Sequence, residues 1–407
     1  MGRVSSRFVR GGAGRLLREH AGFRVYWVAR TLSVTGDQLA RVVLVALVYQ
    51  GGGGAAGVSV LLLAYTTPRL LGPLAGVLAD RWSTRSVMIG ADLAQAGIFM
   101  ALTWTRSLRG TDLLVALAAL AATAYQPAGR SNVPRLVPSD RLTQANALLT
   151  AGSTTGLALG PALAGVLLAT AGARTALLVN AATFLLSAGL TTKLPPLRHG
   201  RTSENTAPLT MSEIARQARA AVRDNPIARA VAVLLLVTVA FAALDNSALI
   251  FLVRRTLHAP NAAYGWVVTA YSLGMIAAPL LISATGRRLP ARRLLYTGQG
   301  VFAAGTFATG LAPDLAISVA AQAVAGAGNG LENTATDTLL QQHTPEPQLG
   351  TVFGTVTAAA YLGQLLAYTV TAPLIDTLGP RTTFLISGTG VLATLGYLAA
   401  HLPTTTT

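Results

Sequence analysis

The amino-acid sequence predicts an all-α membrane protein in which twelve transmembrane helices form two six-helix bundles related by pseudo-symmetry. Composition is the first observation: 11% of the 407 residues are charged and 52% are hydrophobic, whereas about 25% are charged in ordinary globular proteins. This small number of charged side chains cannot cover the surface of a soluble protein of this size. Most of the chain must therefore face lipid. The absence of cysteine also excludes a disulfide-stapled secreted scaffold.

Twelve apolar stretches are the second observation, because a membrane-spanning helix needs about 20 mainly apolar residues. The predicted spans are 24–49, 57–79, 86–105, 112–133, 142–170, 174–194, 228–252, 263–286, 292–311, 314–338, 349–375 and 381–402. With the N-terminus inside, the inner segments hold 22 basic residues and the outer segments six. Positive charge resists translocation, so we expect a multi-pass protein of the inner (plasma) membrane with both termini in the cytoplasm.

An internal repeat with a linker at its middle is the third observation. The two halves align at an offset near 207 residues, so that Asp37 corresponds to Asp245 and Pro138 to Pro345. Residues 195–226 are rich in proline and polar residues, which predicts an N-terminal bundle over 1–194, a cytoplasmic linker over 195–226, and a C-terminal bundle over 227–407. An amphipathic helix in the linker is expected after the capping pair Thr210 and Glu213, either on the inner leaflet or on its own bundle.

The loop after the second span reads GVLADRWSTR and contains Gly76, Asp80, Arg81 and Arg85. It resembles the signature loop G-x-L-A-D-R-x-G-R-R of the major facilitator superfamily, with serine and threonine in place of the glycine and one basic residue. The resemblance implies the major facilitator fold and a latch that holds the two halves together on the cytoplasmic side. The other interpretation is a simple positively charged membrane anchor.

The fifth span carries small residues at every fourth position, including Gly156, Gly160, Pro161 and Gly165. Such spacing lets another helix backbone approach closely. The pattern is similar to the antiporter signature G-x-x-x-G-P-x-x-G-G of the same superfamily, which implies export, although a close-packed glycine-rich helix explains the glycines equally well. Residues 23–48, 87–97 and 125–146 also resemble the branch that contains enterobactin exporters and macrolide-efflux proteins.

Several ionisable residues fall inside predicted spans, where each costs about 2.5–3.5 kcal/mol at the helix centre. The resemblance implies that spans 1, 4, 7 and 10 line a substrate cavity. The candidate proton-coupling or cavity residues are Asp37, Arg69, Asp245, Glu332, Tyr125, Gln126 and Asn329. Alternatively, Asp37 is neutralised by Arg41 four residues away. Arg130 and Asp337 correspond in the repeat and form a possible pair between the bundles.

These patterns predict a secondary exporter that moves a hydrophobic or amphipathic small molecule, such as an antibiotic, natural product or siderophore, in exchange for protons. Sodium is the alternative coupling ion, because carboxylates serve either ion. Other possibilities are an importer of a small polar or anionic solute, held by Arg69 and Arg30, and a polytopic sensor or scaffold. An ATP-driven pump is disfavoured because the sequence contains no phosphate-binding G-x-x-x-x-G-K-[ST] loop. We expect no enzyme activity, cofactor, metal or nucleic-acid partner, and a monomer in the lipid bilayer.

Overall fold

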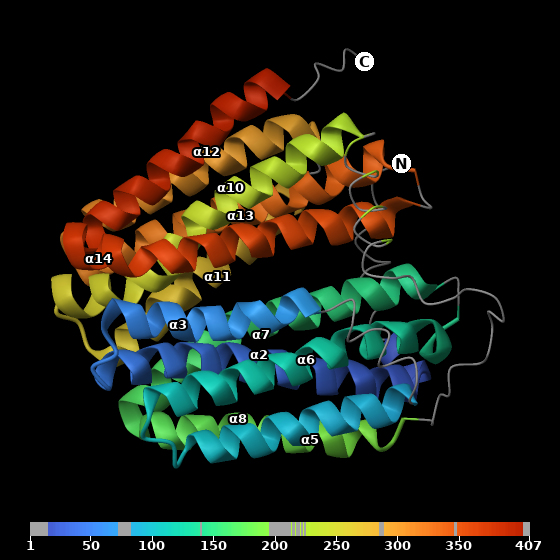
Figure 1. Ribbon diagram of the computed structural model, residues 1–407. Helices are drawn as coiled ribbons and strands as arrows, with labels where there is room; N and C mark the ends of the chain where they lie inside the picture. The colour runs from blue at the N-terminus through green and yellow to red at the C-terminus, as the bar shows by residue number, and fades with distance from the viewer. Residues whose placement is uncertain are drawn as a thin grey trace. The chain divides into compact units, whose positions relative to one another are not determined.

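The computed structural model describes residues 15–71, 83–138, 141–194, 225–284, 289–345 and 348–401, together with residues 213, 216, 220 and 223. Within these residues, all regular secondary structure is helical (Figure 1). The predicted all-α fold class is therefore confirmed. Of the linker helix expected from Thr210 onwards, only Glu213, Arg216, Ala220 and Arg223 are described, and they are helical.

The helices of the first half follow one turn of helix at residues 15–19. They are α2 (Ala21–Gln50), α3 (Gly54–Thr66), the 3-10 helix η1 (Thr67–Leu71), α5 (Thr84–Leu102), α6 (Leu108–Leu136), α7 (Leu142–Thr170) and α8 (Gly172–Thr191). The second half contains α10 (Pro226–Phe251), the π-helix η3 (Leu252–Thr256), α11 (Asn261–Ala284), α12 (Ala291–Leu311), α13 (Leu315–His343) and α14 (Leu349–His401).

Helix α14 is two helices joined at a kink (Figure 1). Gly379 has φ 79°, a left-handed conformation that side-chain-bearing residues rarely adopt, and Pro380 follows it. The kink lies between the eleventh and twelfth predicted spans. Where their residues are described, the predicted spans coincide with helices or with one arm of α14, whereas residues 72–79 of the second span lie outside the description.

Among the described residues, seven helices are long and apolar enough to cross a membrane by length and composition. They are α2, α6, α7, α8, α10 with η3, α11 and α14. The number of twelve spans stays a prediction. Large apolar side chains on these helices are exposed, for example Leu113 at 62%, Leu186 at 59% and Leu281 at 67%, as expected for surfaces that face lipid rather than water.

The internal repeat is visible in the helix boundaries. Helices α5 and α12 begin 207 residues apart, as do α6 and α13, and as do α7 and α14. Helices α6 and α13 both contain 29 residues. The repeat inferred from scattered sequence matches therefore extends to the placement of whole helices.

The chain divides into two compact units. Unit 1 comprises residues 1–44 and 67–205, and unit 2 comprises residues 45–66 and 206–407. Helix α3 belongs to unit 2, where it packs against α14 and α10, and the Thr66 hydroxyl donates a hydrogen bond to Gln364 Oε1 at 3.4 Å. The division into a 1–194 bundle, a linker and a 227–407 bundle stays a prediction.

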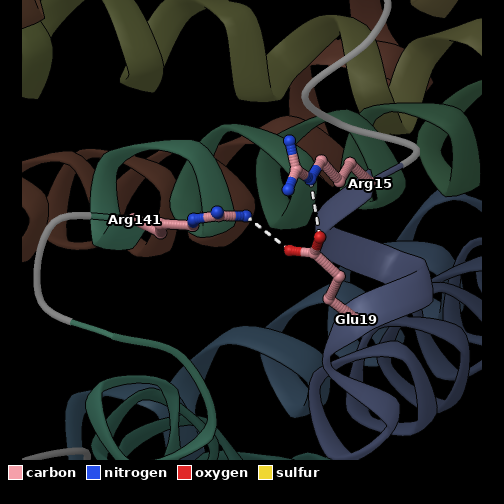
Figure 2. Close-up of polar contacts among 3 residues, drawn as sticks. All are labelled: Arg15, Glu19 and Arg141. Atoms are coloured by element: carbon pink, nitrogen blue, oxygen red, sulfur yellow. Dashed lines mark hydrogen bonds and ion pairs between the residues drawn. The ribbon is translucent and has the colours of Figure 1, made fainter.

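In unit 1, helix α5 packs against α6 and α8, and the rings of Phe99 and Phe184 stack with centroids 5.6 Å apart. A polar tie lies at one end of the unit, where Glu19 accepts from Arg15 Nε at 2.6 Å and from Arg141 Nη1 at 2.9 Å (Figure 2). This tie joins the turn before α2 to the residue that precedes α7. The hydrogen bond from Arg15 lowers the pKa of the Glu19 carboxyl below its usual value, and Arg141 adds to the effect.

In unit 2, helix α13 is packed closely on two sides because it carries a run of glycines. A Cβ on Gly328 would lie 2.6 Å from the carbonyl oxygen of Gly298 on α12. Gly326 and Gly330 instead face backbone atoms of Tyr271 and Met275 on α11. Small residues thus allow three helices to make backbone contact, as is typical of membrane bundles.

Candidate functional site

Much of the signature loop lies outside the described residues, including Gly76, Asp80 and Arg81. Arg85 lies in the first turn of α5. Ser83, which stands where the family pattern has glycine, is the N-cap of α5: its hydroxyl oxygen accepts from the Ser86 amide at 3.1 Å. The substitution therefore supplies a helix cap, whereas the latch stays a prediction.

The glycines of the antiporter-like pattern lie against α2. A Cβ on Gly160 would lie 2.6 Å from the Thr35 carbonyl oxygen, and a Cβ on Gly156 would lie 3.0 Å from the Thr35 amide nitrogen. Such distances are too short for a real Cβ, so α7 and α2 can touch only because these positions lack side chains. Pro161 lies inside α7 and, like Gly165, is buried. The close helix approach inferred from the sequence is therefore confirmed.

A cavity of about 610 Å³ lies in unit 1 between α2, α6 and α7. Its polar lining combines two tyrosines, one arginine and several amide or hydroxyl side chains, which are Tyr26, Arg30, Tyr125, Asn146, Thr150, Ser153 and Thr154. The rest is apolar and comprises Val133, Pro134, Leu142 and Leu149. Its size and its mixed lining suit a drug-sized ligand. Tyr125 lines this cavity, whereas the cavity between spans 1, 4, 7 and 10 for which the sequence made it a candidate stays a prediction.

Among the described residues that line the cavity, Arg30 is the charged one. Its guanidinium carbon lies 5.8 Å from the centroid of the Tyr125 ring, a distance at which a cation is attracted to an aromatic face. Arg30 also interacts electrostatically with two carboxyls outside the lining, Asp37 on the same helix and Asp92 on α5.

Asp37 is half-buried on α2. The cations that act on it are Arg30 and Arg69, and the ion pairs of the described residues include none between Asp37 and Arg41. The intrahelical pair considered from the sequence is therefore not formed. Arg69 lies on η1 and is exposed, and it still acts electrostatically on Asp37.

Asp92 is fully buried and is a member of this group that the list of candidates from the sequence omitted. Ser187 on α8 donates a hydrogen bond to Asp92 Oδ2 at 2.7 Å, whereas Oδ1 has no hydrogen-bond partner among the described residues. Asp92 also interacts electrostatically with Asp37. The sequence signal for Asp92 was a carboxyl inside the third predicted span. Its neighbours Ser187 and Asp37 lie on helices α8 and α2, which are distant in sequence, so the sequence did not show the group.

The candidates of unit 2 do not gather around a cation in the described residues. Thr306 Oγ1 donates to Asp245 Oδ2 at 3.4 Å, and Asp245 Oδ1 has no hydrogen-bond partner within the described part of the chain. Glu332 is 1% exposed, and neither of its carboxyl oxygens has a partner among the described residues. Asn329 is half-buried and accepts from Asn333 Nδ2 at 3.0 Å.

The remaining candidates are not brought together. Asp337 is exposed, and the side chains of Arg130 and Gln126 lie outside the description. The pair between Arg130 and Asp337 stays a prediction. Within the described part of the chain, no group of three or more histidine, cysteine, aspartate or glutamate side chains is placed to hold a metal ion.

Comparison with known proteins gives consistent matches over nearly the whole chain. The family described as transmembrane secretion effector matches residues 17–401. The chain is 27% identical over 387 residues to the uncharacterized MFS-type transporter YfiS of Bacillus subtilis, covering 92% of this chain and 91% of that protein. It is 26% identical over 388 residues to the multidrug efflux pump Tap of Mycobacterium tuberculosis, with 92% of each chain covered.

Solved structures share the fold at low sequence identity. A POT family transporter in complex with 5-aminolevulinic acid has a TM-score of 0.76 at 12% identity, covering 95% of this chain and 97% of that chain. The nucleoside transporter NupG has a TM-score of 0.74 at 13% identity, covering 93% and 98%. At such identities the likeness shows the fold alone, and that fold is the one predicted from the sequence.

Proposed function

Because the chain belongs to the transmembrane secretion effector family of the major facilitator superfamily and is a multi-pass membrane transporter, we propose that it is a secondary active exporter. It moves a hydrophobic or amphipathic small molecule out of the cell in exchange for protons. It lies in the plasma membrane with both termini in the cytoplasm. The bundles 1–194 and 227–407 rock against each other to expose the substrate site to either side in turn.

Two features support export rather than import. Relatives that match this chain along nearly its whole length include the multidrug efflux pump Tap. In addition, the glycines that characterise the antiporter-like pattern make backbone contact between α7 and α2, and α2 carries Arg30 and Asp37. Movement of α7 would therefore act directly on the helix that holds the charged residues of the site.

The observation that carries the proposal is the unit 1 cavity with carboxyls beside it. The cavity is large enough for a drug-sized molecule and offers mainly aromatic, hydroxyl and apolar groups. Asp37 and Asp92 lie within electrostatic range of its single arginine. Desolvation favours the protonated form of a carboxyl group, and ionisable groups inside membranes commonly form proton relays. The presence of a cavity and of neighbouring carboxyls in one unit supports the proposal.

Coupling in this proposal uses carboxyls of both units. Asp37 or Asp245 accepts a proton in the outward-facing state, and the substrate leaves. Glu332 is a third candidate, since a buried carboxyl without a partner is seldom retained in a membrane protein without a function. The signature-loop latch and the Arg130–Asp337 pair would stabilise one of the two states. Charge reversal of Arg130 and Asp337 together should restore activity that either single reversal removes.

The test is transport by purified protein in proteoliposomes with an imposed pH gradient. We expect wild-type protein to move ethidium out of loaded vesicles, and we expect the double variant Asp37→Asn/Asp245→Asn to lose gradient-driven movement by at least about tenfold. The matched control is Asp314→Asn. Asp314 caps α13 through a hydrogen bond from the Ile317 amide, and asparagine caps equally well.

Full gradient-driven export by the double variant would contradict the coupling proposal. An equal response to a sodium gradient in place of the pH gradient would show that sodium is the coupling ion. Accumulation of solute inside cells that express the protein, instead of extrusion, would show an importer.

A further inference from the structure

The cavity of unit 1 already holds a cation on an aromatic face. The Arg30 guanidinium carbon lies 5.8 Å from the Tyr125 ring centroid, and both side chains line the cavity. Aromatic faces bind organic cations by the same attraction, which grows stronger as the site is desolvated. The protein's own arginine therefore marks a position where a cationic ligand can bind.

Arg30 is shared between this ring and two carboxyls. It interacts electrostatically with Asp37 and Asp92, and Asp92 has one oxygen without a hydrogen-bond partner in the described residues. A guanidinium has five N–H donors in a rigid fork, so an ionised carboxylate beside it competes strongly with a neutral ring for its position.

From this arrangement we propose that the unit 1 cavity binds an amphipathic cation on the face of Tyr125, in competition with Arg30. Arg30 thereby links substrate binding to protonation of Asp37 and Asp92. The proposal rests on the proposed exporter function and deepens it by naming the substrate class and the residue that couples substrate to proton.

The sign of the coupling follows from charge. When Asp37 and Asp92 are ionised, they attract Arg30 away from the ring, and the ring face is open to a substrate cation. When they are protonated, Arg30 returns to Tyr125 and the cavity becomes more positive, which repels the cation. Proton and cation therefore weaken each other's binding, and this effect is reciprocal. Mutual antagonism of this kind is what antiport requires, whereas an anion would bind more tightly with the proton.

The groups that act on the two carboxyls come from every element around them. Helix α2 contributes Arg30 and Asp37 itself, η1 contributes Arg69, α6 contributes the Tyr125 hydroxyl, and α8 contributes the Ser187 hydroxyl. Arg69 is exposed, so solvent screens its charge. Of the two arginines in this group, Arg30 also lines the cavity, so it is the one that can respond both to the carboxyls and to a bound ligand.

The first experiment compares two probes of the same shape and opposite charge, tetraphenylphosphonium and tetraphenylborate. Binding of each to the purified full-length protein is measured by calorimetry at about pH 6 and about pH 8, a range in which perturbed carboxyls titrate. We expect the phosphonium to bind roughly tenfold more tightly at the higher pH and the borate to show the opposite trend. Absence of phosphonium binding, or the same pH trend for both probes, would overturn the proposal.

The second experiment separates Arg30 from a general effect of charge. Arg30→Gln should abolish most of the pH dependence of phosphonium binding, and Arg30→Lys should restore part of it. Tyr125→Leu should weaken phosphonium binding by roughly tenfold. The matched control is Arg24→Gln on the same helix, because Arg24 is exposed and does not line the cavity. Unchanged pH dependence in Arg30→Gln would contradict the role of Arg30.

Wild-type protein alone supplies the decisive comparison of the two probes, so a variant that fails to fold does not prevent a result. Export measured in parallel distinguishes the two proposals. If proteoliposomes export a neutral solute with protons but the protein does not bind phosphonium, the exporter stands and the present inference falls. If no solute moves under any gradient, the proposed function falls, whatever the binding data show.

Discussion

The two units of the molecule carry different chemistry on repeated helices. In the repeat, Asp92 corresponds to Gln299 and Tyr125 to Glu332 at an offset of 207 residues. At the offset of 208 that pairs Asp37 with Asp245 in the first helix of each half, Arg30 corresponds to Thr238. In unit 1 an arginine acts on the two carboxyls Asp37 and Asp92. Unit 2 has a neutral amide in place of Asp92 and a hydroxyl in place of Arg30, and no cation of the described residues acts on its carboxyls Asp245 and Glu332.

The hydrogen bonds follow this difference. In unit 1, Asp92 accepts from Ser187 on α8, whereas in unit 2 Gln299 donates its amide N–H to Thr238 on α10 at 3.0 Å. A neutral amide and a hydroxyl can keep their hydrogen bond whatever the pH, because neither group changes charge. A carboxyl beside an arginine, in contrast, changes charge when it binds a proton. Under the proposed function, we therefore expect Asp92 to respond to protons and Gln299 to have a structural role.

The largest expected effect is on stability, at a feature that both units share. This feature is the close helix contact at Gly156 in unit 1 and at its counterpart Gly363 in unit 2. A Cβ on Gly156 would lie 2.8 Å from Val34 Cγ1, and one on Gly363 would lie 3.2 Å from the Ala240 amide nitrogen. Gly156→Leu and Gly363→Leu should each destabilise the protein by about 3 kcal/mol or more. Thermal unfolding monitored by size-exclusion chromatography in detergent measures this.

The control for both glycines is Gly97→Leu on α5, since a Cβ there meets nothing within 4 Å and the residue is exposed. This variant should be as stable as the wild type or slightly more so, because leucine favours helix over glycine. If Gly97→Leu destabilised the protein as much as Gly156→Leu, the backbone contacts would not be the cause.

Exchange of residues between the units tests the contrast between Asp92 and Gln299. Asp92→Gln should preserve the fold, because the repeat accommodates glutamine at this level, but it should reduce proton-driven export by roughly tenfold. Gln299→Asp should destabilise the protein by about 1–3 kcal/mol, because it removes the donor to Thr238 and leaves a buried carboxyl without a cation. Export rates and melting temperatures are measured for both variants.

The opposite pattern, with normal export by Asp92→Gln and lost export by a stable Gln299→Asp variant, would place the responsive site in unit 2. A double exchange that behaved like the wild type would show that the two positions are equivalent.

Glu332 gives a more moderate prediction. Both of its carboxyl oxygens are buried without a partner among the described residues, so Glu332→Gln should leave the melting temperature unchanged or raise it. If Glu332 carries a proton during transport, the same variant should also export more slowly by roughly tenfold under a pH gradient. Unchanged export with a lowered melting temperature would instead make Glu332 a structural residue with an undetected partner.

The smallest effect is expected at the tie of Glu19 with Arg15 and Arg141 (Figure 2). The pKa of Glu19 is lowered in the folded protein, so the tie stabilises at pH values above the ordinary pKa of glutamate and is lost as pH falls through the lowered value. Glu19→Gln should therefore lower the melting temperature slightly near neutral pH and not at acidic pH. A difference that persisted unchanged in acid would contradict the electrostatic origin.

The fold was largely predictable because composition and repeat act along the whole chain. Apolar stretches located the long helices of the described residues, and the repeat offset of 207 residues relates the boundaries of α6 to those of α13. Small residues at every fourth position in α7 likewise predicted close packing, since helix geometry alone brings such residues onto one face. The sequence did not show which helix packs against these small residues, and in the structure that helix is α2.

The site was less predictable because its members meet across helices. Asp37 and Tyr125 were identified from their position in spans. In contrast, Asp92 was omitted from the candidates because nothing in the sequence shows that it lies with Ser187, Asp37 and Arg30. Spacing within one helix suggested the wrong partner for Asp37, namely Arg41, since i and i+4 contacts are the only ones a sequence displays directly. The cations that act on it are Arg30, two turns away on the same helix, and Arg69, which tertiary packing brings near from η1.

The central claim, that this protein exchanges protons for substrate, is tested most directly by following both at once in proteoliposomes. Vesicles loaded with tetraphenylphosphonium and a luminal pH-sensitive dye are diluted into substrate-free buffer without an imposed pH gradient. The account predicts that phosphonium efflux acidifies the lumen, and that Asp92→Gln reduces this acidification. A lumen that stays at constant pH, or becomes alkaline as substrate leaves, would contradict it.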